Sequence, residues 1–250
     1  MPFAWDLVVA GERLKYVAYD GSRWIAIIKD GDYHIPAVSL DGKNFSVVGG
    51  HDLSNSVLVL FLVYAPGIGW IIGESVSSAG VGGKMWISAD GQSWNSEVVD
   101  VLDDFLVNQL KAMAVGAGVI VTVTNGGTVY TSTNGNTWTL RDTPLSDPTA
   151  LVHAGSLFLL GGESSQIFTS PNGTTWTQRT SPLSGRIAGF AYDGVGTYVA
   201  LSYFPAGCAR SSDGVTWVQQ DIPIGETRSL SHSARCSRLE ASWGGRNATR

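Results

Sequence analysis

Short apolar runs separated by glycine-containing turns extend along most of the chain, and they predict a protein built of β-strands. Residues 186–222 show the pattern most clearly, because runs rich in valine, isoleucine, leucine and aromatic residues alternate there with turn residues. Such runs are typical of buried strands. In this segment we predict strands at Ile187–Tyr192, Thr197–Ser202, Cys208–Ser211 and Thr216–Gln220.

Four other segments repeat the order of a first and a second strand. The predicted pairs are Tyr16–Tyr19 with Trp24–Ile28, Leu58–Tyr64 with Trp70–Ile72, Ala112–Val115 with Val119–Thr124, and Ala150–His153 with Leu157–Leu160. His153 ends its run beside Ala154-Gly155 and is interpreted as a turn residue. We predict no amphipathic helix, and Val98–Lys111 has room for one or two helical turns at most.

A seven-residue phrase, Ser-x-Asp/Asn-Gly-x-x-Trp/Phe, recurs five times, at residues 39–45, 88–94, 132–138, 170–176 and 211–217. Asp-Gly and Asn-Gly between two strands predict a tight hairpin, because glycine accepts positive φ and the Asp or Asn side chain can accept hydrogen bonds from the turn amides. The closing aromatic residue can wedge against a neighbouring sheet. The structural positions of the motif are Asp41, Asp90, Asn134, Asn172 and Asp213, with Phe45, Trp94, Trp138, Trp176 and Trp217 as the closing aromatics.

The phrase resembles the Asp-box, or BNR, repeat of sialidase-like β-propellers, in a variant with one residue fewer between Asp and Gly. The resemblance covers nearly the whole chain and implies an all-β fold, a propeller of four-stranded blades. The closing aromatics fall 38 to 49 residues apart, a spacing that fits one blade per repeat. The strands of each blade are called A to D in chain order, so that the phrase, hereafter the box, is the C–D turn.

We predict one domain over residues 1–250 with six blades. Trp5-Asp6-Leu7-Val8-Val9 is similar to a D strand, so residues 1–10 are expected to complete a last blade formed by residues 226–250. The alternative is five blades with a loose tail. Residues 226–250 are rich in arginine and serine, and they fit a degenerate blade, a basic functional tail or an altered reading frame.

Composition narrows the choice of partners. The formal charge is −5, the isoelectric point is about 5.3 and charged residues make up 15% of the chain, which argues against a general nucleic-acid binder. The N-terminus carries no positive segment followed by a long apolar run, and Val57–Val63 is too short to cross a membrane, so we expect a soluble protein without an export signal. Cys208 and Cys236 do not form a disulfide framework.

Catalytic chemistry is not indicated. Tyr33-His34-Ile35-Pro36 resembles the Tyr/Phe-Arg-Ile-Pro signature of sialidases, but His34 replaces the arginine that would grip a carboxylate. The four histidines lack metal-ligand spacing, and Glu97, Asp100, Asp103 and Asp104 fit a solvated loop better than a calcium site. We therefore expect no catalytic residues, no metal and no cofactor.

A binding site is expected where the B–C turns and D–A connections gather, at the end opposite the boxes. Tyr203-Phe204-Pro205 is the most suggestive turn, because exposed aromatic side chains provide surface for stacking on a sugar or anchoring a protein. The candidate ligand-binding residues are Tyr203, Phe204, His51, Asp52, Arg141, Asp142, Arg179 and Arg186.

Three functions remain open. The first is a non-catalytic binding or structural propeller of a bacteriophage virion, in its capsid, tail or fibre, which contacts a host glycan or a neighbouring virion protein; outside a phage, the protein would be cytoplasmic. The second is an assembly or scaffold factor similar to the propeller that assists photosystem II assembly. The third is a glycan-active hydrolase that uses carboxylates such as Asp32, Glu74, Asp142 or Glu163.

Overall fold

The structure is a computed structural model that describes residues 13–30, 33–48, 57–76, 84–97, 110–142 and 145–221. All regular secondary structure in these ranges is β-strand, arranged in four-stranded antiparallel sheets. The chain divides into two compact units, an N-terminal unit within Phe3–Thr143 and a C-terminal unit within Pro144–Arg250. Each unit is described by itself.

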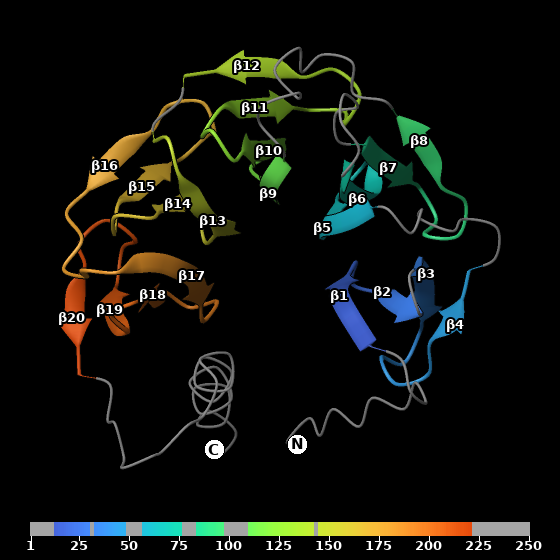
Figure 1. Cartoon of the computed structure of the whole chain (residues 1–250), viewed down its shortest axis with the longest axis horizontal. Coiled ribbons are helices and arrows are strands. Elements are labelled where there is room, and N and C mark those ends of the chain that lie inside the picture. Colours follow the sequence, from blue (N-terminus) through green and yellow to red (C-terminus); the bar gives the residue numbers. More distant parts are fainter. Residues whose placement is uncertain are drawn as a thin grey trace. The chain divides into compact units, whose positions relative to one another are not determined.

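The N-terminal unit contains three sheets, and each is a simple meander in chain order (Figure 1). The first consists of β1 (Arg13–Tyr19), β2 (Trp24–Asp30), β3 (Tyr33–Ser39) and β4 (Ser46–Val47), and the second of β5 (Val57–Ala65), β6 (Gly69–Val76), β7 (Lys84–Ser88) and β8 (Asn95–Glu97). The third consists of β9 (Leu110–Gly116), β10 (Val119–Thr124), β11 (Val129–Ser132) and β12 (Thr139–Arg141).

The C-terminal unit contains two sheets of the same order (Figure 1). The fourth sheet consists of β13 (Pro148–Ala154), β14 (Leu157–Gly162), β15 (Ile167–Ser170) and β16 (Thr177–Arg179). The fifth consists of β17 (Arg186–Tyr192), β18 (Tyr198–Tyr203), β19 (Gly207–Ser211) and β20 (Val218–Gln220). The five sheets correspond to the five predicted blades that carry a box.

The strands are apolar on both faces because neighbouring sheets within a unit pack face to face. In the N-terminal unit, Ile25 and Ile27 of the first sheet pack with Trp70 and Ile72 of the second. Side chains alternate between the faces of a strand, so that Ile71, between those two residues, packs toward the third sheet. Burial on both faces explains why the sequence shows continuous apolar runs instead of a clean alternation.

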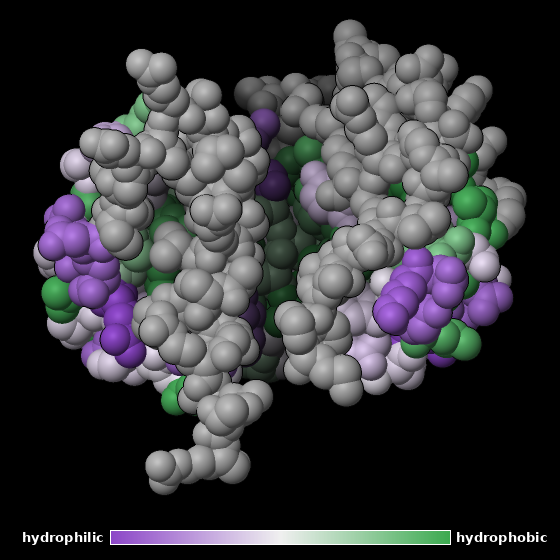
Figure 2. Space-filling model, turned by 90° about the horizontal axis from the view of Figure 1, so that it is seen from below, coloured by the Kyte–Doolittle hydropathy of each residue, from purple (hydrophilic) through white to green (hydrophobic). Residues whose placement is uncertain are grey.

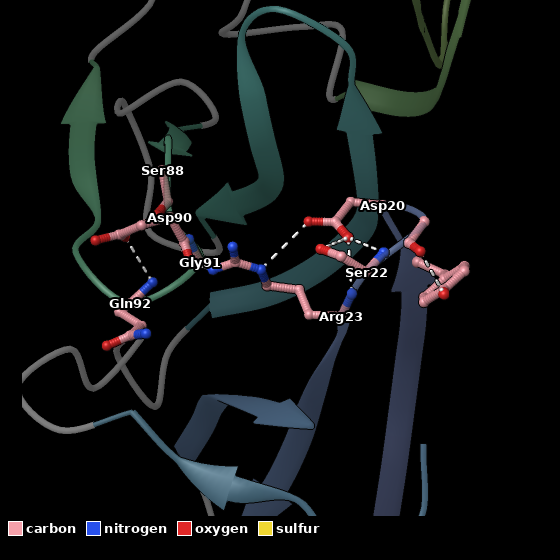
Figure 3. Close-up of polar contacts among 9 residues, drawn as sticks. Asp20, Ser22, Arg23, Ser88, Asp90, Gly91 and Gln92 are labelled. Carbon is pink, nitrogen blue, oxygen red and sulfur yellow. Dashed lines mark hydrogen bonds and ion pairs between the residues drawn. The ribbon is translucent and has the colours of Figure 1, made fainter. Parts of the chain in front are cut away.

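Each box forms the same hydrogen-bonded turn between strands C and D. In the second sheet, Asp90 Oδ1 accepts a hydrogen bond of 2.8 Å from the backbone amide of Gln92 (Figure 3). It also accepts one of 2.7 Å from the amide of Ser93. The amide of Gly91 donates to Ser88 Oγ at 2.8 Å, and Gly91 has a φ of 70°. An asparagine oxygen accepts the same set of bonds in the boxes of the third and fourth sheets.

The closing aromatics differ in depth. Trp94, Trp138 and Trp217 are buried in the clusters between sheets, whereas Phe45 and Trp176 are half-buried. Three box glycines lie in these layers too, since a Cβ on Gly91, Gly135 or Gly214 would lie 2.6, 3.2 or 2.9 Å from a side chain of the preceding sheet, Ile25, Ile87 or Leu157 respectively. The box is therefore a joint between adjacent sheets as well as a turn.

The predicted strands that fall on described residues overlap observed ones, and β10 has the predicted bounds. The interpretation of His153 as a turn residue is wrong. His153 lies in β13, paired with Phe158, because the strand continues through Ala154 and the turn needs only the next two residues. The predicted closing strand at residues 1–10, the last blade at 226–250 and most of Val98–Lys111 lie outside the described residues. Leu110 and Lys111, at the end of that segment, begin strand β9.

Candidate binding surface

The B–C turn of the fifth sheet, residues 204–206 between β18 and β19, presents an aromatic side chain to solvent. Phe204 is 75% exposed, and its ring contacts that of Tyr203 edge to face with the centroids 4.3 Å apart. The turn is braced from below, because Ser202 Oγ donates to the carbonyl of Pro205 at 3.1 Å. Gly185 leaves no space beneath the turn, since a Cβ there would lie 2.5 Å from that carbonyl oxygen. The backbone that carries the exposed ring is thus held in place from two sides.

Arg186 lies next to this turn. It follows Gly185 at the start of β17, and its backbone pairs with Tyr203 of β18. Its Nη1 atom is 3.5 Å from Glu163 Oε1, and both side chains are 48% exposed. An ion pair this exposed contributes little to stability, about 0–1 kcal/mol. It presents two opposite charges, one of them on the residue whose backbone pairs with Tyr203. Glu163, Arg186, Tyr203 and Phe204 together are called the aromatic turn surface.

The other predicted site residues are placed differently. Arg179 Nε donates to Thr169 Oγ1, and Arg141 Nε donates to Thr131 Oγ1, each at 2.8 Å within its own sheet. These arginines occupy equivalent positions, at the end of strand D in the fourth and third sheets. Asp142 follows Arg141 and is exposed in the N-terminal unit. His51 and Asp52 lie outside the described residues.

The described surface is mixed in character, and Figure 2 shows hydrophilic and hydrophobic residues next to each other on it. Exposed large hydrophobic residues occur in both units, and Val195 and Val218 accompany Phe204 in the C-terminal unit. Single exposed apolar residues are ordinary on protein surfaces. Phe204 differs from the two valines because a second ring contacts it, a hydrogen bond closes its turn, and the strand paired with Tyr203 begins at the ion-paired Arg186.

A recurring ring pair at the A–B hairpins was missed in the sequence. In four sheets, a ring in the last or next-to-last position of strand A contacts a ring in the first or second position of strand B, with centroid separations of 4.5 to 4.9 Å. The pairs are Tyr19 with Trp24, Tyr64 with Trp70, His153 with Phe158, and Tyr192 with Tyr198. The signal was present, since each of these hairpins carries one ring close before its short turn and one close after it. Burial lowers the pKa of His153, because the charged form of the ring loses hydration there.

Two ionisable residues lie deep in the N-terminal unit. Glu74 is 1% exposed and His34 is 6% exposed. Glu74 shares a face of β6 with Trp70 and Ile72, which pack on the first sheet. His34 pairs with Lys29, two residues beyond Ile27 on the face of the first sheet that packs on the second. Both residues therefore belong to the layer between the first and second sheets, and neither presents its charge at a loop surface.

The hydrolase hypothesis gains no carboxylate pair from this arrangement. In the N-terminal unit, Glu74 is buried between sheets and Asp142 is exposed after strand β12. In the C-terminal unit, Glu163 is engaged with Arg186. Asp32 lies outside the described residues. Within the described part of the chain, no three His, Cys, Asp or Glu side chains gather as metal ligands would. Of the acidic cluster considered as a calcium site, only Glu97 is described.

No family model matches the chain, and a comparison with curated proteins found no match. Solved structures do match it. YCF48 from Cyanidioschyzon merolae is 15% identical, with a TM-score of 0.60 over 84% of this chain and 72% of that one. YCF48 bound to a D1 peptide is 17% identical, with a TM-score of 0.58 over 83% of this chain and 66% of that one, just under two thirds.

Virginiamycin B lyase from Staphylococcus aureus is 11% identical, with a TM-score of 0.52 over 85% of each chain. These matches are β-propellers. The chain has the β-propeller fold. Because the identities are low and one match is an enzyme, the likeness is one of fold alone. Within the part of the chain that the structure describes, no helix is long and apolar enough to span a membrane.

Proposed function

We propose that this chain is a non-catalytic binding propeller and that its aromatic turn surface contacts an extended segment of a partner protein. The observation that carries the proposal is the exposed, braced ring of Phe204 beside the Arg186–Glu163 ion pair. Protein-binding sites concentrate their energy in a few fixed aromatic and arginine side chains. Because the backbone of the turn is already held in place, it loses little conformational freedom when a partner binds, and more of the contact energy appears as affinity.

The chemistry of the surface describes the partner. An apolar side chain would cover Phe204, and flanking charged groups would exchange with the Arg186–Glu163 pair, which separates at little cost because it is half-exposed. A propeller solved with a peptide bound, YCF48, supports the general mode and favours the scaffold hypothesis over the virion hypothesis. In the virion hypothesis the partner would be a neighbouring virion subunit, and the same side chains would make the contact.

The test is selection of binding sequences from a random peptide library displayed on yeast, followed by titration calorimetry of the selected peptides. We expect Phe204→Ala to weaken binding about tenfold or more, as loss of a central aromatic contact does. Val195→Ala is the matched control, because Val195 is an exposed apolar residue of the same unit in a different turn. Peptides that bind Phe204→Ala as tightly as the unchanged protein would contradict the proposal.

A glycan is the second candidate, and the ring of Phe204 favours it, because sugars stack on exposed aromatic faces. A glycan array with the unchanged protein, Tyr203→Ala and Phe204→Ala separates the two. Binding to defined sugars that both substitutions abolish would replace the peptide proposal with a glycan-binding one. Absence of binding on the array, together with peptide binding that depends on Phe204, would support the proposal of a protein partner.

A further inference from the structure

The described residues contain three Asn-Gly dipeptides, Asn125-Gly126, Asn134-Gly135 and Asn172-Gly173. This dipeptide is the one most prone to spontaneous deamidation, because glycine has no side chain to hinder attack of its backbone nitrogen on the Asn side-chain carbonyl. The three sites have the same chemistry and different surroundings. Their comparison within one molecule isolates the effect of the fold.

The two box asparagines are held in place. In the third sheet, Asn134 Oδ1 accepts hydrogen bonds from Ser132 Oγ and from the amides of the second and third residues after it, at 3.1, 2.9 and 2.8 Å. The amide of Gly135, which would be the attacking nitrogen, donates to Ser132 Oγ at 2.8 Å. Asn172 and Gly173 make the same bonds with Ser170 and the following amides. Reaction at these sites requires the box to open first.

Asn125 is not held in this way. It lies in the B–C turn of the third sheet, between β10 and β11, and it and Gly126 are both exposed. The residues on either side of this pair close the turn, since the amide of Gly127 donates a hydrogen bond of 2.9 Å to the carbonyl of Thr124. Within the described part of the chain, no hydrogen bond engages the Asn125 side chain or the Gly126 amide. The reacting groups can therefore approach each other while the sheet stays intact.

We propose that Asn125 is a site of spontaneous deamidation in the folded protein and that the boxes protect Asn134 and Asn172. In the reaction, the Gly126 amide gives its proton to solvent and its nitrogen bonds to Asn125 Cγ. The Cγ–Nδ2 bond breaks, and the amine takes up a proton and leaves as ammonia. Water then opens the five-membered imide at either carbonyl to give aspartate or isoaspartate. No electrons are transferred, and the turn gains one negative charge.

The experiment is incubation of the purified protein at mildly alkaline pH, with peptide mapping by mass spectrometry over time. We expect deamidation at Asn125 about tenfold or more faster than at either box site, since the box sites react only through locally opened states. A parallel incubation in denaturing urea should bring the three rates close together. Gly126→Ala should slow the reaction at Asn125 alone, because a methyl group hinders the attacking nitrogen.

Ser132→Ala tests the protective contact. We expect it to speed deamidation of Asn134 while the rates at Asn172 and Asn125 stay unchanged. An unchanged circular dichroism spectrum and an unchanged rate at Asn172 show that the variant is still folded. If the variant unfolds, the comparison of the unchanged protein with and without urea decides whether the fold protects the box asparagines. Equal rates at the three sites in the folded protein would overturn the proposal, as would faster reaction at either box site than at Asn125.

Discussion

Arg23 Nη1 donates a hydrogen bond of 2.8 Å to the backbone carbonyl of Asp90, and this bond joins the first sheet to the box of the second (Figure 3). Arg23 is oriented from its own turn, where its Nε atom lies 3.4 Å from Asp20 Oδ2. Asp20 Oδ1 accepts from the amides of Ser22 and Arg23 at 2.7 and 2.8 Å. An A–B turn of one blade thus fixes the C–D turn of the next.

We predict that Arg23→Ala lowers the free energy of unfolding by about 0.5–1.5 kcal/mol, the usual net contribution of one hydrogen bond. Arg210→Ala is the control, because Arg210 Nη2 bonds to Thr197 within a single sheet. Urea unfolding followed by tryptophan fluorescence measures both variants. Equal losses in the two variants would show that the link between sheets adds nothing beyond an ordinary surface contact.

The fold was largely predictable because its signals are local. A strand such as Val119–Thr124 and a box such as Asp90-Gly91 are each recognisable within a few residues. Contacts between blades were not predictable, since Arg23 and Asp90 are 67 positions apart and no periodicity joins them. The same reason hid the pairing of Arg186 with Glu163 and the burial of Glu74, which depend on how sheets stack.

Two turn glycines, Gly91 of a box and Gly194 of an A–B turn, provide a second prediction. Gly91 and Gly194 both have positive φ, at 70° and 81°, but only Gly91 has a side chain of another sheet near its missing Cβ. Gly194→Ala should cost about 1–2 kcal/mol, the price of the left-handed backbone alone. Gly91→Ala should cost a further 1–3 kcal/mol or so, because its Cβ would meet Ile25. Thermal unfolding of the two variants checks the difference, and equal melting temperatures would refute the packing contribution.

The box carboxylates predict a loss of stability in acid. Backbone amides that donate to Asp213 lower its pKa to about 2, and amides that donate to Asp193 lower the pKa of that residue to about 2 as well. Hydrogen bonds from turn amides also lower the pKa values of Asp41, Asp90 and Asp20. A folded pKa below the unfolded value of 3.8 stabilises the protein fully above that value. This stabilisation is lost as the pH falls from about 4 toward 2.

Asp213→Asn tests this relation. We expect a small effect at neutral pH, because Asn134 and Asn172 make the same bonds in other boxes. Between about pH 4 and 2, the free energy of unfolding measured in urea should fall less in this variant than in the unchanged protein. The difference should equal the contribution of one carboxylate. Asp213→Ala should destabilise at every pH, by about 1 kcal/mol as for a lost turn cap. An unchanged acid dependence in Asp213→Asn would contradict the assigned pKa.

His153 predicts a second pH dependence, at higher pH than that of the carboxylates. Burial against Phe158 lowers its pKa below the ordinary 6.5, so the folded state favours the neutral ring. Stability is then complete above about pH 6.5 and falls as the pH drops, because the unfolded chain takes up the proton first. His153→Phe keeps a ring against Phe158 and removes the titrating group. We expect its unfolding midpoint to change less between about pH 7 and 5 than that of the unchanged protein. If both proteins lose stability equally over this range, another group is responsible and the predicted role of His153 is wrong.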